Sequence, residues 1–98
     1  MSLPFTFSPE ARQELQDAVR FYERKSVGLG AEFAEEVRTA VDQIVHHPSW
    51  GAPSSVGTRP RMLRRFPYSI IYLHEPGSIE IIAVVHQRRD PGYWQDRL

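Results

Sequence analysis

The segment Ile79–His86 (IEIIAVVH) constrains the fold most, because Ile81–Val85 within it is apolar at five successive positions. Successive side chains of a strand point to opposite faces, so both faces of this segment need cover. The run is far shorter than the roughly 20 residues of a membrane span. The segment therefore predicts a central strand of a sheet, and we expect no membrane segment and no membrane partner.

Two amphipathic stripes precede this strand. Ser8–Glu10 is typical of a helix start, with a capping side chain, a proline in the first turn and an acid near the positive end of the helix dipole. Apolar residues recur at helical spacing over Ala11–Tyr22, which predicts a helix from Pro9 to about Lys25. A second stripe over Phe33–Val45 ends before Pro48, which disfavours a helical residue before it. Two such helices form a hairpin that needs a sheet to cover.

The remaining segments supply that sheet. The loop Ser49–Gly57 is rich in Ser and Gly, and Pro76-Gly77 centres a turn. Strands are predicted at Phe5–Phe7, Thr58–Phe66, Tyr68–His74 and Ile79–His86. The order β-α-α-β-β-β predicts one two-layer α+β domain over residues 1–98, with the helical hairpin on one face of a small, mainly antiparallel sheet. The other face, if open, is where a partner would bind.

The charge is unevenly distributed, although 12 basic and 12 acidic side chains sum to zero. Residues 1–50 carry five basic and eight acidic side chains, a net charge of −3, and residues 51–98 carry seven basic and four acidic ones, a net charge of +3. Every basic residue of the second half is arginine, whose planar fork grips phosphate or carboxylate through two hydrogen bonds. Overall neutrality therefore does not exclude an anionic partner.

Several classes of protein are excluded or not expected. The chain has no Cys, which excludes a disulfide scaffold and Cys-ligated zinc or iron–sulfur sites. His46 and His47 are adjacent and point apart on a helix, without an evident third ligand. The start has neither a basic nor an apolar signal region, so we expect a cytoplasmic protein. No metal and no cofactor are expected.

The first candidate site is the arginine-rich segment RPRMLRR. On a continuous strand, Arg59, Arg61 and Arg65 share one face and Arg64 lies on the other. Guanidinium groups on one face repel each other unless anions lie between them, which favours a phosphate-binding strip for nucleic acid. An exposed edge strand protected from aggregation by its charges explains the pattern equally well.

The second candidate site follows the last strand, where His86 precedes Arg88 and Arg89. RNA cleavage by the 2′-hydroxyl needs a base, an acid and positive charge at the phosphate, which His86 and the arginines supply without a metal. Alternatively, His86 is a strand-terminal histidine that hydrogen-bonds the backbone. The aromatic pair Tyr93-Trp94 stacks on bases or packs on the core; we favour packing for Trp94 and leave Tyr93 open. Trp50 is expected at the margin of the core.

These segments together resemble the RelE/ParE superfamily of type II toxins, often described as plasmid stabilisation proteins. The similarity covers nearly the whole chain. It rests on FSPEA at 7–11, RPRMLRRFPY at 59–68, IIY at 70–72 with IEI at 79–81, and AVVHQRRDPGYW at 83–94.

The resemblance implies an antitoxin partner and one of two targets. RelE-like members are RNA-binding endoribonucleases that cut ribosome-bound mRNA; by position, this implies catalytic roles for Arg61, Arg65, His86 and Tyr93 and binding roles for Arg59, Arg64, Arg88 and Arg89. ParE-like members inhibit DNA gyrase without enzymatic activity, and a member that has lost toxicity remains a binding module. The RelE-like reading is slightly preferred, although those nucleases usually carry catalytic lysines and this chain has one lysine, Lys25. A homodimer and a toxin–antitoxin hetero-oligomer both stay open.

Overall fold

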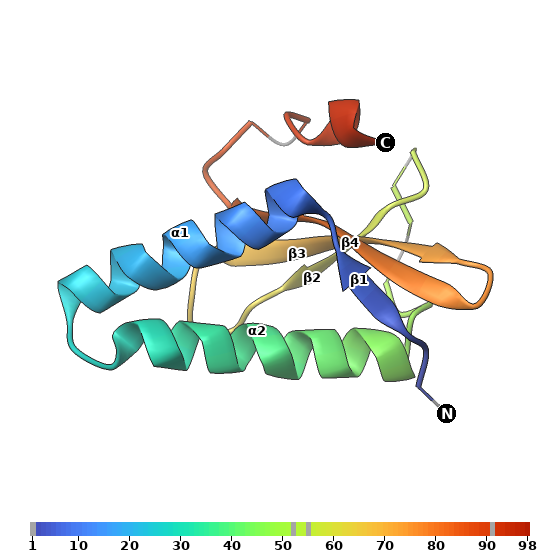
Figure 1. Cartoon of the computed structure of the whole chain (residues 1–98). Helices are drawn as coiled ribbons and strands as arrows, with labels where there is room; N and C mark the ends of the chain where they lie inside the picture. Colours follow the sequence, from blue (N-terminus) through green and yellow to red (C-terminus); the bar gives the residue numbers. More distant parts are fainter. Residues whose placement is uncertain (1, 52, 55, 91) are drawn as a thin grey trace.

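The computed structural model describes residues 2–51, 53–54, 56–90 and 92–98 (Figure 1). The predicted β-α-α-β-β-β order is confirmed. Residues 52 and 55 of the predicted loop, and residue 91 of the C-terminal motif, lie outside the described residues. The elements are β1 (Phe5–Phe7), α1 (Pro9–Lys25), α2 (Leu29–His46), β2 (Arg59–Met62), β3 (Tyr68–Glu75), β4 (Ser78–His86) and a final 3-10 turn (Gln95–Arg97).

The sheet has the strand order β1-β4-β3-β2, so β4 is an interior strand, as its two apolar faces predict. β1 runs parallel to β4, and the other neighbouring strands are antiparallel. Ile71 pairs with Ala83 and Tyr72 with Ile81, so Ile82 is an extra residue that forms a bulge in β4. The bulge places Ile82 and Ala83 in the same cluster, whereas Ile81 and Val84 belong to the cluster under the helices, so the apolar run serves both faces of the sheet.

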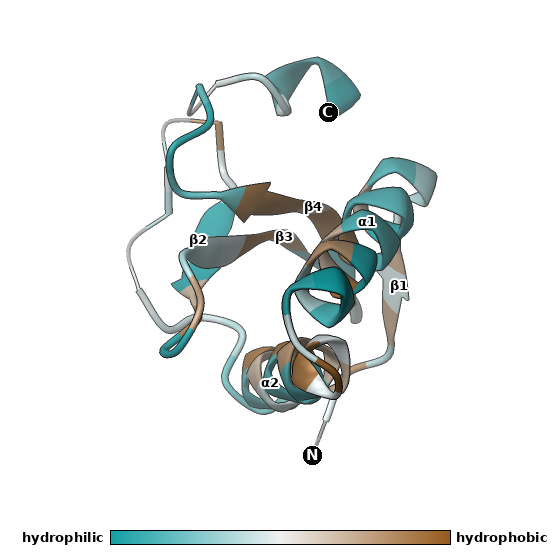
Figure 2. Cartoon of the chain, turned by 90° about the vertical axis from the view of Figure 1, so that its left-hand side faces the viewer, coloured by the Kyte–Doolittle hydropathy of each residue, from teal (hydrophilic) through white to brown (hydrophobic). Residues whose placement is uncertain are grey.

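Each face of the sheet has its own apolar cluster. The larger cluster lies under the two helices, where Phe33, Ile44 and Tyr72 are fully buried. On the opposite face, Trp94 of the C-terminal segment is buried against Ile71, Ile82 and Ala83. Figure 2 shows this segment and α2 on opposite sides of the sheet. The predicted packing of Trp94 is confirmed, and the second face is covered there by the chain itself.

The arginine-rich strand is shorter than predicted, because β2 ends at Met62 rather than at Phe66. The carboxylate of Glu36 on α2 accepts hydrogen bonds from the backbone N–H groups of Arg64 and Arg65. Phe66 then turns into the core, where its ring centre lies 5.0 Å from that of Phe33. The strand parity expected for Arg64 and Arg65 is therefore wrong.

The helical hairpin closes through Glu23, near the end of α1. Its carboxylate accepts hydrogen bonds from the backbone N–H groups of Gly28 and Gly30, at 2.9 and 3.1 Å, and so caps the start of α2. Gly30 also lies where the helices come close together, because a Cβ atom there would lie 2.6 Å from the carbonyl oxygen of Val19. This glycine is required by contact rather than by an unusual backbone angle.

Replacing Gly30 with alanine is expected to lower the free energy of unfolding by about 1–3 kcal/mol, because α1 and α2 must move apart. Gly92→Ala is the control, since its Cβ would meet no atom closer than 3.8 Å and the change should stay within about 0.5 kcal/mol. Urea denaturation of the two variants measures both values. Equal stability of the two would show that the helices do not meet at Gly30.

Candidate functional site

The structure divides the predicted site residues into two groups. His86, Arg89 and Tyr93 line one hollow of about 340 Å³ between α1 and the end of β4, which we call the His86 hollow. The other group, which we call the arginine edge, consists of Arg59, Arg61, Arg64 and Arg65. None of these four lines the His86 hollow, and three of them line hollows beside α2 instead. Arg88 is exposed and contributes no side chain to the His86 hollow.

Groups of the protein itself bind the guanidinium groups of three arginines of the arginine edge. Arg59 donates hydrogen bonds to the carbonyl oxygens of Ser49 and Gly51. Arg61 donates to the side chain of Gln43 at 3.0 Å. Arg65 pairs with Glu32 at 2.7 Å, and this hydrogen bond raises the pKa of Arg65. The loop after α2 supplies the acceptors for Arg59 and α2 supplies those for Arg61 and Arg65, so these three arginines are held without an anion between them.

Trp50 lies beside the arginine edge and is half exposed, so the expectation that it packs at the core margin is wrong. Its ring stacks on that of His47, with the ring centres 4.0 Å apart. The guanidinium carbon of Arg61 lies 5.3 Å from the centre of the Trp50 ring. Met62 at the end of β2 is also largely exposed. The arginine edge is therefore flanked by exposed apolar side chains of the types that protein interfaces favour.

His86 stands at the end of β4 with its ring against Tyr68 of β3, the ring centres 5.1 Å apart. Its Nδ1 atom accepts a hydrogen bond from the backbone N–H of Arg88 at 3.0 Å. A backbone N–H only donates, so the proton of the neutral imidazole is on Nε2. This contact matches the alternative interpretation of His86 as a strand-terminal histidine bonded to the backbone. Its second nitrogen is then a hydrogen-bond donor rather than a base.

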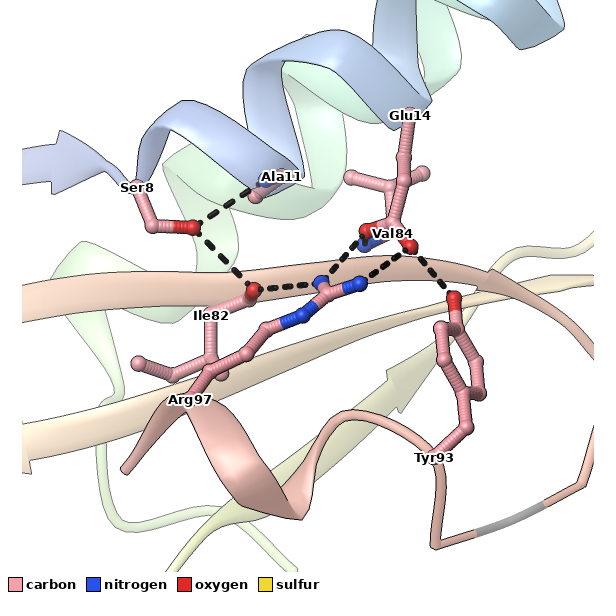
Figure 3. A network of polar contacts seen from close by, with 7 residues as sticks. All are labelled: Ser8, Ala11, Glu14, Ile82, Val84, Tyr93 and Arg97. Atoms are coloured by element: carbon pink, nitrogen blue, oxygen red, sulfur yellow. Dashed lines mark hydrogen bonds and ion pairs between the residues drawn. The ribbon is translucent and has the colours of Figure 1, made fainter.

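The edge of β4 lacks a strand partner beyond Ile81, where β1 ends. Side chains replace that partner, as Figure 3 shows. The hydroxyl of Ser8 caps α1 by accepting from the N–H of Ala11, and it donates to the carbonyl oxygen of Ile82 at 3.1 Å. Glu14 accepts from the N–H of Val84 at 3.0 Å. Side chains of α1 therefore bind backbone groups at the edge of β4 that lack a strand partner.

The C-terminal segment completes this network through Arg97. Its guanidinium meets both carboxylate oxygens of Glu14, at 2.9 and 3.0 Å, and donates to the carbonyl oxygen of Ile82 at 3.1 Å. The hydroxyl of Tyr93 also donates to Glu14. Burial and this hydrogen bond raise the pKa of Tyr93 to about 12. The phenol of Tyr93 is therefore held in its protonated form.

Sequence reasoning missed four residues of this region: Glu14, Arg24, Tyr68 and Arg97. Glu14 and Arg97 are 83 positions apart, so no local pattern connects them. Arg24 and Tyr68 line the His86 hollow, but each fits an ordinary pattern: a basic residue in the last turn of a helix and an aromatic residue in a strand. The signals that existed were the basic last turn of α1 for Arg24 and the end of the RPRMLRRFPY motif for Tyr68.

The hollow is rich in donors and poor in proton acceptors. Its two carboxylates are already engaged: Glu14 as described, and Asp17 by Gln13 and Arg20. Those hydrogen bonds lower the pKa of Asp17. Arg24, Arg89, Tyr68 and His86 line the hollow and carry N–H or O–H groups, and the guanidinium carbon of Arg89 lies 4.1 Å from the centre of the Tyr93 ring. Such a lining holds an anion better than it removes a proton from a hydroxyl.

Comparisons with known proteins agree with this architecture. Residues 5–91 match the family model described as ParE toxin of type II toxin-antitoxin system, parDE. A solved structure described as a chromosomal ParDE toxin–antitoxin system from P. aeruginosa is similar in fold. Its TM-score is 0.73 at 19% identity, over 87% of this chain and 96% of that chain. No curated protein sequence matches the chain.

The family match, on a two-layer fold with a helical hairpin, defines a toxin from a type II toxin–antitoxin module. The chain belongs to the ParE toxin family, since the family model covers most of its length. Membership implies a cognate antitoxin as its partner. Across the described residues, no helix is long and apolar enough to cross a membrane.

Replacing Arg97 with alanine is expected to cost about 2–3 kcal/mol of stability, because Glu14 is left without its cation. The two side chains are only 17% and 20% exposed. Arg20→Ala is the matched control, since Arg20 and Asp17 form a pair that is 59% and 63% exposed, and its loss should cost less than about 0.5 kcal/mol. Urea denaturation measures the difference. Similar costs for both variants would contradict a tethering role for Arg97.

Proposed function

We propose that the chain is a toxin that inhibits DNA gyrase by binding it, and that it does not cleave RNA. Membership of the ParE family supports this choice, because the gyrase-inhibiting members of the superfamily are the ParE-like ones. The single lysine supports it too, since RelE-like nucleases usually carry catalytic lysines. This choice reverses the preference that the sequence alone suggested.

The observation that carries the proposal is the engagement of both candidate acid–base groups. Cleavage through the 2′-hydroxyl needs a group that takes up the hydroxyl proton. Nδ1 of His86 is occupied by a backbone N–H, and the hydroxyl of Tyr93 donates to Glu14. The nuclease hypothesis needs Arg61 and Arg65 to stabilise the phosphate, but these two arginines line other hollows. The acid–base groups and the phosphate-binding arginines that a nuclease needs therefore do not lie in one hollow.

The arginine edge is the surface that we assign to the gyrase contact. Arg, Trp and Met are enriched in the cores of protein interfaces, and Arg and Trp dominate their binding energy. Here Arg61 stacks on the half-exposed Trp50, next to the exposed Met62. Because α2 already holds the guanidinium of Arg61, little side-chain freedom is lost on binding.

The test is expression of the toxin in cells with three readouts: the DNA-damage response, gyrase cleaved complexes and mRNA 5′ ends. We expect the first two to rise and no codon-phased cuts to form. His86→Ala should keep this activity. Trp50→Ala should reduce inhibition of purified gyrase at least tenfold, and Phe21→Ala is its control because Phe21 is an equally exposed aromatic residue elsewhere.

Two outcomes contradict the proposal. One is unchanged supercoiling by purified gyrase at a saturating dose of toxin. The other is codon-phased mRNA cleavage that disappears in the His86→Ala variant, which would restore the RelE-like hypothesis.

For the antitoxin we propose a docking site on the helical side. An apolar groove of about 360 Å³ lies between α1, α2 and β1 and is lined by Phe5, Phe7, Val37 and Val41, with Arg38 and Asp42 at its border. Trp94 covers part of the opposite face of the sheet, which favours the groove over that face. An amphipathic segment of the antitoxin suits such a groove.

Phe5→Ala is expected to weaken antitoxin binding about tenfold by removing one wall of this groove. Phe5 is 46% exposed, so the fold should tolerate the change. Phe21→Ala is the control, because Phe21 is 44% exposed and lies outside the groove. Titration calorimetry with the purified antitoxin measures both affinities. A larger loss of affinity with Phe21→Ala than with Phe5→Ala would contradict this proposal and indicate that the antitoxin binds the other side of α1.

A further inference from the structure

We propose that the surface between α2 and β2 binds an acidic segment of gyrase, which places a carboxylate against Arg61 and Arg64 and an apolar side chain against Trp50. This inference rests on the proposed function and adds the chemistry of the partner segment. The surface contains a hollow of about 370 Å³ whose lining includes Trp50, Arg61, Met62 and Arg64, and we call it the Trp50 hollow. It shares no lining residue with the apolar groove or the His86 hollow.

Two guanidinium groups at the Trp50 hollow lack an ion-pair partner within the described residues. Arg61 and Arg64 both line the hollow, and neither takes part in any of the ion pairs found there. The carboxylate in the lining is that of Glu36, and its oxygens accept the backbone N–H groups of Arg64 and Arg65. An acidic group of a partner would therefore supply the charge that the chain itself does not place against these two arginines.

The shape of a guanidinium group suits a carboxylate. Its N–H groups lie in one plane, and two of them match the two oxygens of a carboxylate. Nη1 of Arg61 is anchored on the side chain of Gln43 at 3.0 Å. No carboxylate among the described residues forms an ion pair with this group. Arg61 thus presents an anchored fork that an acidic side chain can meet with little loss of side-chain freedom.

An apolar wall stands beside these charges. Trp50 is 51% exposed and Met62 is 65% exposed, whereas Leu63 at the same hollow is buried. The Trp50 ring is held by its stack on His47, with the two ring planes 5° apart. Covering such exposed apolar groups with a partner side chain removes them from water, which favours binding. We therefore expect an apolar residue next to the acid of the partner segment.

The distribution of charge favours a protein segment over a nucleic acid. The neighbouring hollow along α2 is lined by three carboxylates and two guanidinium groups, those of Glu32, Glu35, Glu36, Arg64 and Arg65. A nucleic acid repeats its negative charge at every phosphate, so it would extend from the Trp50 hollow over these carboxylates. A protein segment can place one acid at the arginines and neutral residues beside the carboxylates.

The first experiment measures the affinity of the purified toxin for purified gyrase by biolayer interferometry. Arg64 is exposed, so the fold should tolerate its replacement. Arg64→Glu should weaken binding about tenfold or more, because it sets like charges against each other. Arg64→Lys keeps the charge but loses the planar fork, so its affinity should lie between those of the wild type and Arg64→Glu. Arg12→Glu is the control: it makes the same charge change at an exposed arginine of α1 outside the Trp50 hollow and should change the affinity less than about twofold.

The second experiment identifies the segment by photo-crosslinking. A photoreactive benzoylphenylalanine in place of Met62 stands at the rim of the Trp50 hollow, where the side chain is largely exposed. Mass spectrometry of cross-linked gyrase is expected to find a segment in which acidic residues outnumber basic ones and a large apolar residue is present. Replacing the acid of that segment with lysine should restore much of the affinity that Arg64→Glu loses, because the pair is then rebuilt with its charges exchanged.

The outcomes separate this inference from the proposed function. Failure of the wild-type toxin to inhibit supercoiling contradicts the proposed function. If the wild type inhibits gyrase, equal affinity of Arg64→Glu, an equal loss with Arg12→Glu or a cross-link to a basic segment overturns the acidic segment alone. Binding of a short DNA duplex without gyrase, lost in Arg64→Glu, would assign the surface to nucleic acid and overturn it too. Weaker binding of the antitoxin by Arg64→Glu, with unchanged binding of gyrase, would likewise overturn it in favour of the antitoxin.

Discussion

The carboxylate of Glu14 is the interaction on which the described structure most depends. It accepts from the backbone of β4 and from the side chains of Arg97 and Tyr93, so one charged group joins a helix, a strand edge and the C-terminal segment. A partly buried carboxylate is costly unless its oxygens are all satisfied, and here they are. The same contacts hold Trp94 over the second face of the sheet. Sheet edge, tail and His86 hollow are therefore one connected unit.

The fold was predictable because its elements follow local patterns. The helical stripes, the Ser8 cap and the Pro76-Gly77 turn each act within a few residues, and all of them are confirmed. Strand Thr58–Phe66 was overextended, because its end depends on Glu36 of α2, almost thirty positions earlier. The bulge at Ile82 was likewise invisible, since two apolar faces and a change of register give the same sequence pattern.

The candidate site was predictable only as a list of residue types. His86, Arg89 and Tyr93 do share a hollow, but Arg61 and Arg65 belong to another surface. The sequence placed these residues in or after the strands of the second half, but it did not show that one group would lie beside α1 and the other beside α2. Their hydrogen bonds could not be predicted either. Nδ1 of His86 accepts from the backbone and the hydroxyl of Tyr93 donates to Glu14, and both contacts depend on the folded structure.

The opposite charges of the two halves have a structural explanation. Acidic α2 faces the arginine edge, where Glu32 pairs with Arg65 and Glu36 accepts from the backbone beside it. That pairing offsets the charge of Arg65, and the exposed side chains of Trp50 and Met62 lie beside the arginines on the surface that we propose for gyrase. On the α1 side of the sheet, Arg24 and Arg89 line the His86 hollow without an ion-pair partner among the described residues. A chain with zero net charge thus carries arginines in two settings, beside exposed apolar side chains next to α2 and in the His86 hollow next to α1.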